Sequence, residues 1–125
     1  MSKSNKKEVN WLSEVEAHDY PAAESYLSII YNPNKVAQLV ITLRVSAIVQ
    51  FKAKDIFRAS KLSLLGVSNS HVQKDCKKIN KGIALSPLLL VRDETHGRVI
   101  IADGYHRLCA VYEFDEEAII FCKIV

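Results

Sequence analysis

Apolar residues recur at helical spacing in two segments near the start of the chain, residues 21–31 and 34–44. Between them stands Asn32, a favoured N-cap residue, and the proline that follows it suits the first position of a helix. The pattern predicts two antiparallel helices joined by a short turn, with Asp19 or Tyr20 placed just before the first helix. The positions expected to be buried in this part of the chain are Trp11, Leu12, Tyr26, Leu27, Ile29, Ile30, Val36, Leu39, Val40 and Leu43.

The rest of the chain alternates between strand-like and helix-like patterns. Runs rich in β-branched and aromatic residues predict strands at residues 47–53, 85–93, 99–103 and 118–125. Helical spacing predicts helices at residues 54–62, 71–81 and 104–114. Thr95-His96-Gly97 predicts a hairpin turn between the second and third strands. The order α-α-β-α-α-β-β-α-β is typical of the α+β class.

Composition narrows the class of protein further. The chain has 125 residues, 49% of them hydrophobic and 25% charged, so a single core can support the fold without disulfides or a metal. No apolar run approaches the roughly 18 residues that a membrane span needs, and the first ten residues lack the apolar core of a signal peptide. We therefore expect one compact cytoplasmic unit behind a disordered leader at residues 1–8. The cysteines lack CxxC spacing and are typical of buried thiols in a reducing compartment: Cys76, Cys109 and Cys122.

Charge is distributed unevenly along the chain. Residues 8–34 contain five acidic residues and no Lys or Arg, residues 35–81 carry a net charge of +8, and residues 82–125 carry −3. At 100° per residue, four lysines of the predicted helix 71–81 share one arc opposite its apolar face: Lys74, Lys77, Lys78 and Lys81. This arc is interpreted as a solvated helix face or as a contact for phosphate, nucleic acid or an acidic partner. Further basic residues around the first strand extend the region, with Phe51 and Phe57 between them: Lys52, Lys54, Arg58 and Lys61.

The segment with the clearest chemistry is Asp103-Gly104-Tyr105-His106-Arg107, where a buried strand turns directly into a helix. His106 and Arg107 stand near the positive end of the helix dipole, where cations are unfavourable unless an anion binds there. Gly104 lacks a Cβ that would block close approach, and the first N–H groups of the helix have no partner within the helix. Arg107 offers a planar fork for phosphate oxygens. These features predict a phosphate-binding turn.

A purely structural interpretation of the same residues remains open. Asp103 can act as an N-cap and Gly104 as a turn glycine, while the cationic side chains are solvated or paired with Asp103 or Glu113. Asp103 is also the candidate near the turn to help hold a Mg²⁺ ion that arrives with a ligand, but no metal site built from protein ligands alone is expected. Cys109 is expected to be an inert buried thiol rather than a nucleophile.

The turn also resembles a known signature. Gly104-Tyr105-His106-Arg107 is similar to the G-x-x-R motif of the ParB/sulfiredoxin-like superfamily (ParB-like nuclease domain), whose partition proteins have Gly-Glu-Arg-Arg and whose sulfiredoxins have Gly-Gly-Cys-His-Arg. Residues 79–92 resemble the helix-Gly-x-x-x-Pro-strand segment of the partition proteins. The resemblance covers residues 47–125 and implies a small mixed sheet with helices packed on it. Residues 9–46 would then form an N-terminal helical extension that joins this domain in one compact unit.

The resemblance implies that the turn binds the phosphates of a nucleotide, such as a nucleoside triphosphate with Mg²⁺. The implied ligands are Gly104, Tyr105, His106 and Arg107, and the residues that could support them are Asp103, Lys77, Lys78 and Lys81. Tyr105 stands where sulfiredoxins have their nucleophilic cysteine, so the resemblance does not extend to sulfinic-acid reduction. Phosphate-ester hydrolysis or transfer would need a general base, a role open only to a neutral His106 in this motif.

Two functional hypotheses follow. In the first, the chain binds a nucleotide or another phosphorylated ligand at the Gly-Tyr-His-Arg turn. In the second, the chain is a noncatalytic interaction module and the turn is structural. Residues 35–81, the basic middle third of the chain, then bind nucleic acid or an acidic protein. The residues do not decide whether the chain is an enzyme.

Overall fold

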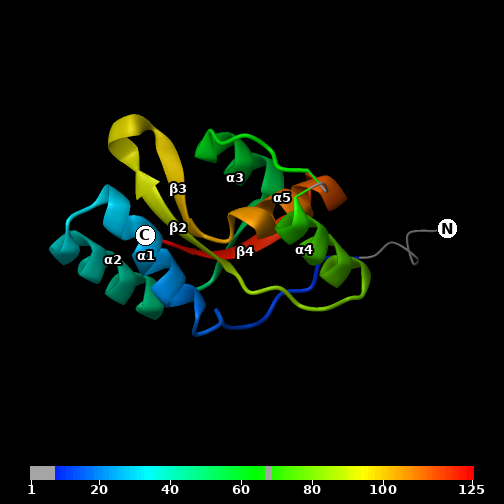
Figure 1. Ribbon diagram of the computed structural model, residues 1–125, viewed down its shortest axis with the longest axis horizontal. Coiled ribbons are helices and arrows are strands. Elements are labelled where there is room, and N and C mark those ends of the chain that lie inside the picture. Colours follow the sequence, from blue (N-terminus) through cyan, green and yellow to red (C-terminus); the bar gives the residue numbers. More distant parts are fainter. Residues whose placement is uncertain (1–7, 67–68) are drawn as a thin grey trace.

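The computed structural model describes residues 8–66 and 69–125. The predicted disordered leader lies outside the described residues except for Glu8, and so do Val67 and Ser68. The elements follow the predicted order, so the α+β class is confirmed: α1 (Asp19–Ile30), α2 (Pro33–Val45), β1 (Val49–Lys52), α3 (Ala53–Ser60), α4 (Ser70–Asn80), β2 (Leu88–Asp93), the 3₁₀ turn η2 (Glu94–His96), β3 (Arg98–Asp103), α5 (Tyr105–Phe114) and β4 (Ile119–Ile124) (Figure 1). No helix among the described residues is long and apolar enough to cross a membrane.

The four strands form one mixed sheet in the order β1-β4-β2-β3. Strands β2 and β3 form the predicted antiparallel hairpin, and β1 pairs antiparallel with β4. Strand β4 runs parallel to β2 and therefore antiparallel to β3, and α5 carries the chain from the end of β3 past β2 to the start of β4. The start of α5 therefore lies directly at the end of β3.

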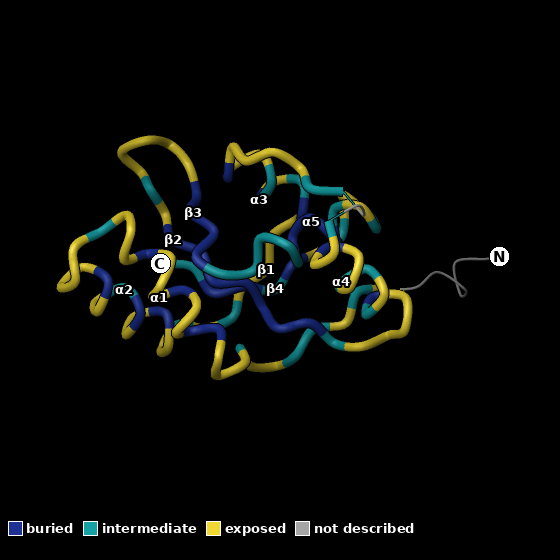
Figure 2. Tube along the Cα trace, in the orientation of Figure 1, coloured by how far each residue is buried: buried dark blue, intermediate teal, exposed yellow. Residues whose placement is uncertain are grey.

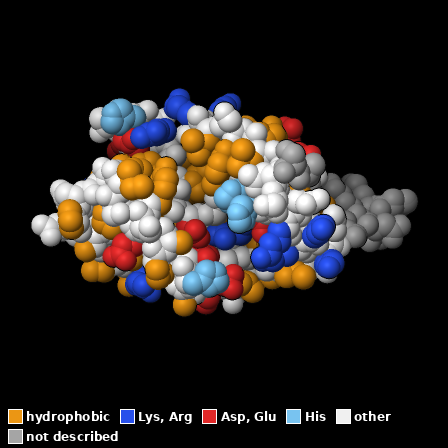
Figure 3. All heavy atoms as spheres, in the orientation of Figure 1, with side chains coloured by type: hydrophobic (Ala, Val, Ile, Leu, Met, Phe, Trp, Pro, Cys, Tyr) orange, Lys and Arg blue, Asp and Glu red, His pale blue; other side chains and the backbone are white. Residues whose placement is uncertain are grey.

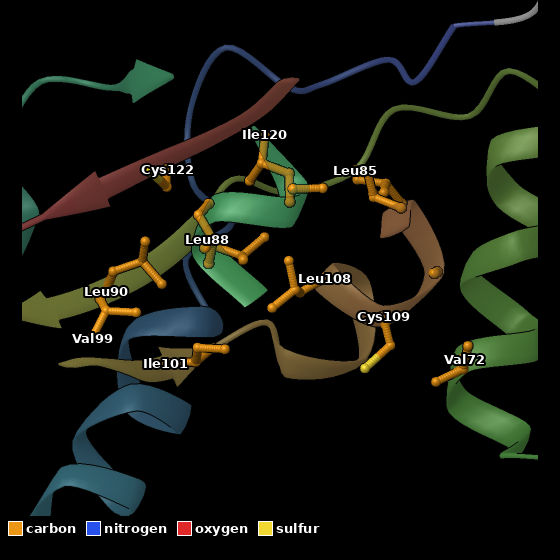
Figure 4. Packing of buried hydrophobic residues seen from close by; sticks show 14 of the residues in the cluster. Val72, Leu85, Leu88, Leu90, Val99, Ile101, Leu108, Cys109, Ile120 and Cys122 are labelled. Atoms are coloured by element: carbon orange, nitrogen blue, oxygen red, sulfur yellow. The ribbon is translucent and has the colours of Figure 1, made fainter. Parts of the chain in front are cut away.

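Helices cover both faces of the sheet, because the side chains of β2 alternate between two buried clusters. Leu88 and Leu90 join the cluster beneath α3, α4 and α5 (Figure 4). Leu89 and Val91 point to the opposite face and pack with α1 and α2. Strands buried on both faces read as continuous apolar runs, and in Figure 2 this strand is buried for most of its length.

The N-terminal helices differ from the expectation at the start of α1. Asn32 caps α2 as predicted, since its side-chain oxygen accepts a hydrogen bond from the Lys35 N–H at 2.9 Å. The placement of Asp19 or Tyr20 before the first helix was wrong, because α1 begins at Asp19 and its N-cap is His18, whose side chain makes no capping bond. Asp19 and Tyr20 are both buried in the first turn.

The buried face of α1 is also different from the predicted one. Leu27, Val36, Val40 and Leu43 are buried as expected, whereas Tyr26, Ile29 and Ile30 are 45%, 84% and 39% exposed, so the prediction for these three was wrong. Apolar residues occupy five of the six positions 26–31 and so cover more than one face of the helix. Only the face of Tyr20, Ala23 and Leu27 meets the sheet.

Residues before α1 form an extended segment along the chain that enters β2. Leu85 donates a backbone hydrogen bond to Asn10 and accepts one from Leu12, both at 2.8 Å. Trp11 bridges to Leu85 and stacks on Phe121 of β4 with 6.0 Å between ring centroids. This segment brings α1 to the side of the molecule where β3 turns into α5.

Candidate functional site

The turn between β3 and α5 depends on Gly104. This residue is the N-cap of α5 with φ 108° and ψ 16°, and no side chain caps the helix. A Cβ at this position would lie 2.7 Å from Leu88 Cγ and 2.9 Å from Arg107 Nη2, so only glycine fits without displacement. The interpretation of Asp103 as an N-cap was wrong, because the glycine after it is the N-cap. The first N–H groups of α5 are therefore not satisfied by a side-chain cap.

Arg107 lies behind this turn and is held by two carboxylates from different elements. Its Nη2 atom is 3.1 Å from Asp103 Oδ2 and 3.4 Å from Asp19 Oδ2. The side chain is only 17% exposed, and its Nε atom is buried without a hydrogen-bond partner in residues 8–66 and 69–125. Pairing with Asp103 is what the structural interpretation expected, whereas the contact with Asp19 was not foreseen.

Asp19 links the N-terminal helices to the turn. Its carboxylate is buried, and Oδ2 accepts a hydrogen bond of 2.6 Å from the Ser86 hydroxyl. The Ser86 oxygen in turn accepts from the Glu16 N–H at 3.0 Å, and His18 Nε2 lies 3.2 Å from Asp19 Oδ1. Asp19 and Arg107 are 88 positions apart, so no local pattern in the sequence could join them.

Burial sets the protonation behaviour of the carboxyl groups here. It raises the pKa of Asp103 above the ordinary value, against the opposing effect of Arg107 and with added help from the neighbouring Asp19 carboxylate. Burial likewise raises the pKa of Asp75 on α4, while Arg107, Lys78 and other nearby cationic groups lower it. Both groups therefore take up a proton more readily than exposed carboxylates.

His106 points toward α4, where it meets His71. The two ring centroids are 4.8 Å apart, and the Tyr105 ring is 5.9 Å from that of His106. Burial lowers the pKa of His106 below its ordinary value of 6.5, as do the cationic forms of His71 and Arg107, while Asp75 acts in the opposite direction. The imidazole is therefore neutral at pH 7 and can accept a proton.

Tyr105 and Cys109 connect α5 to the segment that follows α3. The Tyr105 hydroxyl donates a hydrogen bond to the Ser63 carbonyl, and the Cys109 sulfur accepts one from the Leu65 N–H at 3.5 Å. Cys109 is buried, and burial raises the pKa of its thiol. A buried thiol with a raised pKa is a poor nucleophile. Cys122 is also buried, whereas Cys76 is half-buried.

A cavity of about 390 Å³ lies in front of the turn. The turn lines it through Asp103, Gly104, Tyr105 and His106. The other lining residues are Ile101 and Ala102 of β3, Ala22 and Tyr26 of α1, and Leu62 after α3. In Figure 3 a histidine stands near the centre of this face, between a hydrophobic area and a group of Lys and Arg side chains.

The lysines predicted to support the phosphate site differ in their contacts with the residues around the turn. Helix α4 packs on α5, and Lys78 lies near enough to Asp75 to lower the pKa of that carboxyl. Lys77 and Lys81 are exposed, and no interaction among the described residues joins them to the turn. In the rest of the basic middle third, Lys52 and Lys54 lie 3.2 and 2.6 Å from the Glu117 carboxylate, which neutralises part of that surface.

No group of three or more His, Cys, Asp or Glu side chains in residues 8–66 and 69–125 is placed to hold a metal ion. No protein-family model, curated protein or solved structure matches the chain.

Proposed function

We propose that the chain binds a phosphorylated ligand, in the first instance a nucleotide, at the N-terminal turn of α5. The observation that carries the proposal is the uncapped start of α5, which opens through Gly104 onto the cavity of about 390 Å³. Backbone N–H groups at a helix start attract anions through their hydrogen-bond capacity and the helix dipole. The resemblance of Gly104-Tyr105-His106-Arg107 to the ParB/sulfiredoxin-like signature supports the same ligand class.

Arg107 is suited to a supporting role in this site. The carboxylates of Asp103 and Asp19 fix its Nη2 atom, so little rotamer entropy remains to be lost when a ligand binds. Its buried Nε–H has no acceptor among the described residues, and a buried donor without a partner costs roughly 1–3 kcal/mol. Because Nε is buried, Arg107 supports the site through its charge and its fixed position rather than through a contact at Nε.

The two carboxylates beside Arg107 repel an anion, and protonation of Asp103 would reduce this repulsion. Because the pKa of Asp103 is already raised, an approaching phosphate raises it further and favours uptake of a proton. Binding should therefore be tighter at lower pH. Sulfate, which keeps its charge between pH 5 and 8, tests this without interference from titration of the ligand.

Two further chemical roles, metal binding and proton transfer, depend on residues that line the cavity. Asp103 is the one carboxylate among the cavity-lining residues, and its Oδ2 atom is engaged by Arg107, so a Mg²⁺ ion would be held mainly by the phosphates of the ligand. If hydrolysis or transfer occurs, the neutral imidazole of His106 is the group that can act as general base.

A thermal-shift titration with AMP, ADP and ATP, each with and without Mg²⁺, tests the proposal. A nucleotide at a hundred times its dissociation constant should add about 2.7 kcal/mol of stability. The shift should be lost in Arg107→Ala. Arg107→Ala leaves two carboxylates without their cation and can therefore destabilise the fold. Arg107→Lys keeps the positive charge and serves as a second variant that should fold. It should still weaken binding, because lysine lacks the planar guanidinium group. Absence of any shift in the wild-type protein would refute the proposal.

The exposed lysines on α4 favour a second candidate, a noncatalytic module that binds nucleic acid or an acidic protein. Lys74, Lys77 and Lys81 are exposed on this helix, and Figure 3 shows Lys and Arg side chains gathered over it. The double variant Lys77→Glu with Lys78→Glu separates the two functions. It should abolish binding of a single-stranded DNA oligonucleotide if the second candidate is correct, and leave nucleotide binding nearly unchanged if the first is correct.

A further inference from the structure

The cavity in front of α5 is lined by two chemically different groups of residues. The turn residues Asp103 to His106 contribute polar groups, while Ala22 and Tyr26 of α1 and Leu62 contribute apolar surface. Tyr26 is 45% exposed and Leu62 41% exposed, although both are large apolar side chains. A cavity that combines anion-binding groups with apolar surface fits an amphipathic ligand better than a free phosphate ion.

Tyr26 has no role in the core. The buried face of α1 consists of Tyr20, Ala23 and Leu27, which leaves the Tyr26 ring on the cavity side of the helix. Ala22 is four positions earlier and therefore on the same face of α1. Both residues line the cavity together with the turn, and the small methyl group of Ala22 takes up little of its volume.

We propose that Tyr26 is the residue against which the base of the bound nucleotide stacks, with Leu62 on a neighbouring wall and Ala22 providing the space. The inference rests on the proposed binding of phosphate at the turn, and it assigns to the N-terminal helices a direct part in the site. Aromatic rings stack with any base, so Tyr26 favours nucleotides over sugar phosphates without choosing strongly among bases. A cavity of about 390 Å³ is near the lower end of the range for small-molecule sites, which favours a mononucleotide.

The test compares ligands that share the phosphate group and from which first the base and then the ribose is removed. AMP, CMP, ribose 5-phosphate and inorganic phosphate are titrated calorimetrically into the full-length chain. Wild-type protein should bind AMP and CMP at least about tenfold more tightly than ribose 5-phosphate, the change expected from one stacked base. Tyr26→Ala should remove this preference and leave the affinity for inorganic phosphate unchanged.

A second variant tests the space beside the ring. Ala22→Leu places a larger side chain in the cavity at an exposed position of α1. Leucine is a good helix former, so the variant should fold. It should weaken the binding of AMP far more than the binding of inorganic phosphate. Ile29→Ala and Ala37→Leu are matched controls, because both lie at exposed helical positions outside the cavity lining. Neither should change the AMP affinity.

The outcomes separate this inference from the proposed function. If inorganic phosphate and ribose 5-phosphate bind but the nucleotides bind no more tightly, the stacking role is refuted while the phosphate site stands. An unchanged base preference in Tyr26→Ala refutes it as well. If none of the four ligands binds the wild-type protein, the phosphate site and the stacking role both fail.

Discussion

Replacement of Gly104 by alanine tests the geometry of the turn most sharply. The new Cβ would lie 2.7 Å from Leu88 Cγ and 2.9 Å from Arg107 Nη2, both closer than side chains normally approach. Leu88 is fully buried and cannot move without disturbing the cluster around it. In addition, φ at this position is 108°, a value that residues with a Cβ rarely adopt.

The expected cost has two parts. Backbone strain at positive φ is worth roughly 1–2 kcal/mol for a residue with a Cβ. Overpacking against a filled core adds about 1–3 kcal/mol. The free energy of unfolding of Gly104→Ala should therefore fall by about 2–5 kcal/mol, a large part of the total stability of a domain of this size.

Other glycines provide matched controls. Gly97 has φ 61°, and no described atom lies within 4 Å of the place that a Cβ would take, so Gly97→Ala should lose only the backbone part, roughly 1–2 kcal/mol. A Cβ on Gly66 would likewise meet no described atom within 4 Å, and the φ of Gly66 is not positive, so Gly66→Ala should be neutral or slightly stabilising. Urea unfolding followed by the fluorescence of Trp11 measures all three. A loss in Gly104→Ala no greater than that in Gly97→Ala would refute the described packing of the turn.

Further predictions concern the charged groups around the turn. Arg107→Ala should lower the free energy of unfolding by about 3–5 kcal/mol, because it leaves the Asp19 and Asp103 carboxylates without their cation, and chemical denaturation checks this. Asp19→Asn should loosen Arg107 and strengthen sulfate binding measured by calorimetry, since one opposing negative charge is removed. Because the pKa of His106 is lower in the folded chain than in the unfolded chain, the unfolded chain takes up a proton at this residue first as the pH falls. The neutral His106 therefore contributes its full share to stability above pH 6.5, and this contribution is lost as the pH falls below that value. His106→Gln should therefore flatten the denaturation midpoint against pH in this range, and an unchanged slope would contradict the assignment.

The order of the elements could be predicted because each has a local signal. The N-cap Asn32, the β-branched runs and the hairpin turn at Thr95-His96-Gly97 are all short-range features. The turn into α5 could also be located, since Gly104 follows a buried strand and precedes a helix. These signals place the backbone of the candidate site correctly.

The residues that other elements contribute to the candidate site could not be predicted in the same way. Asp19 reaches Arg107 only because α1 packs on the end of β3, a consequence of tertiary structure. Tyr26 was expected in the core because apolar residues surround it in the sequence, and hydrophobicity alone does not tell which face of α1 meets the sheet. The side chains that complete the cavity therefore became visible only with the fold.

The most direct test of the phosphate-binding turn is a ¹H–¹⁵N NMR titration of the labelled protein with ATP. The account predicts saturable shifts in the backbone amides of Tyr105 and His106 and in the Nε–H of Arg107, for which no acceptor lies among the described residues. The α4 amides around Lys77 should move little. Shifts confined to α4, or no saturable shift at the turn, would contradict the central claim.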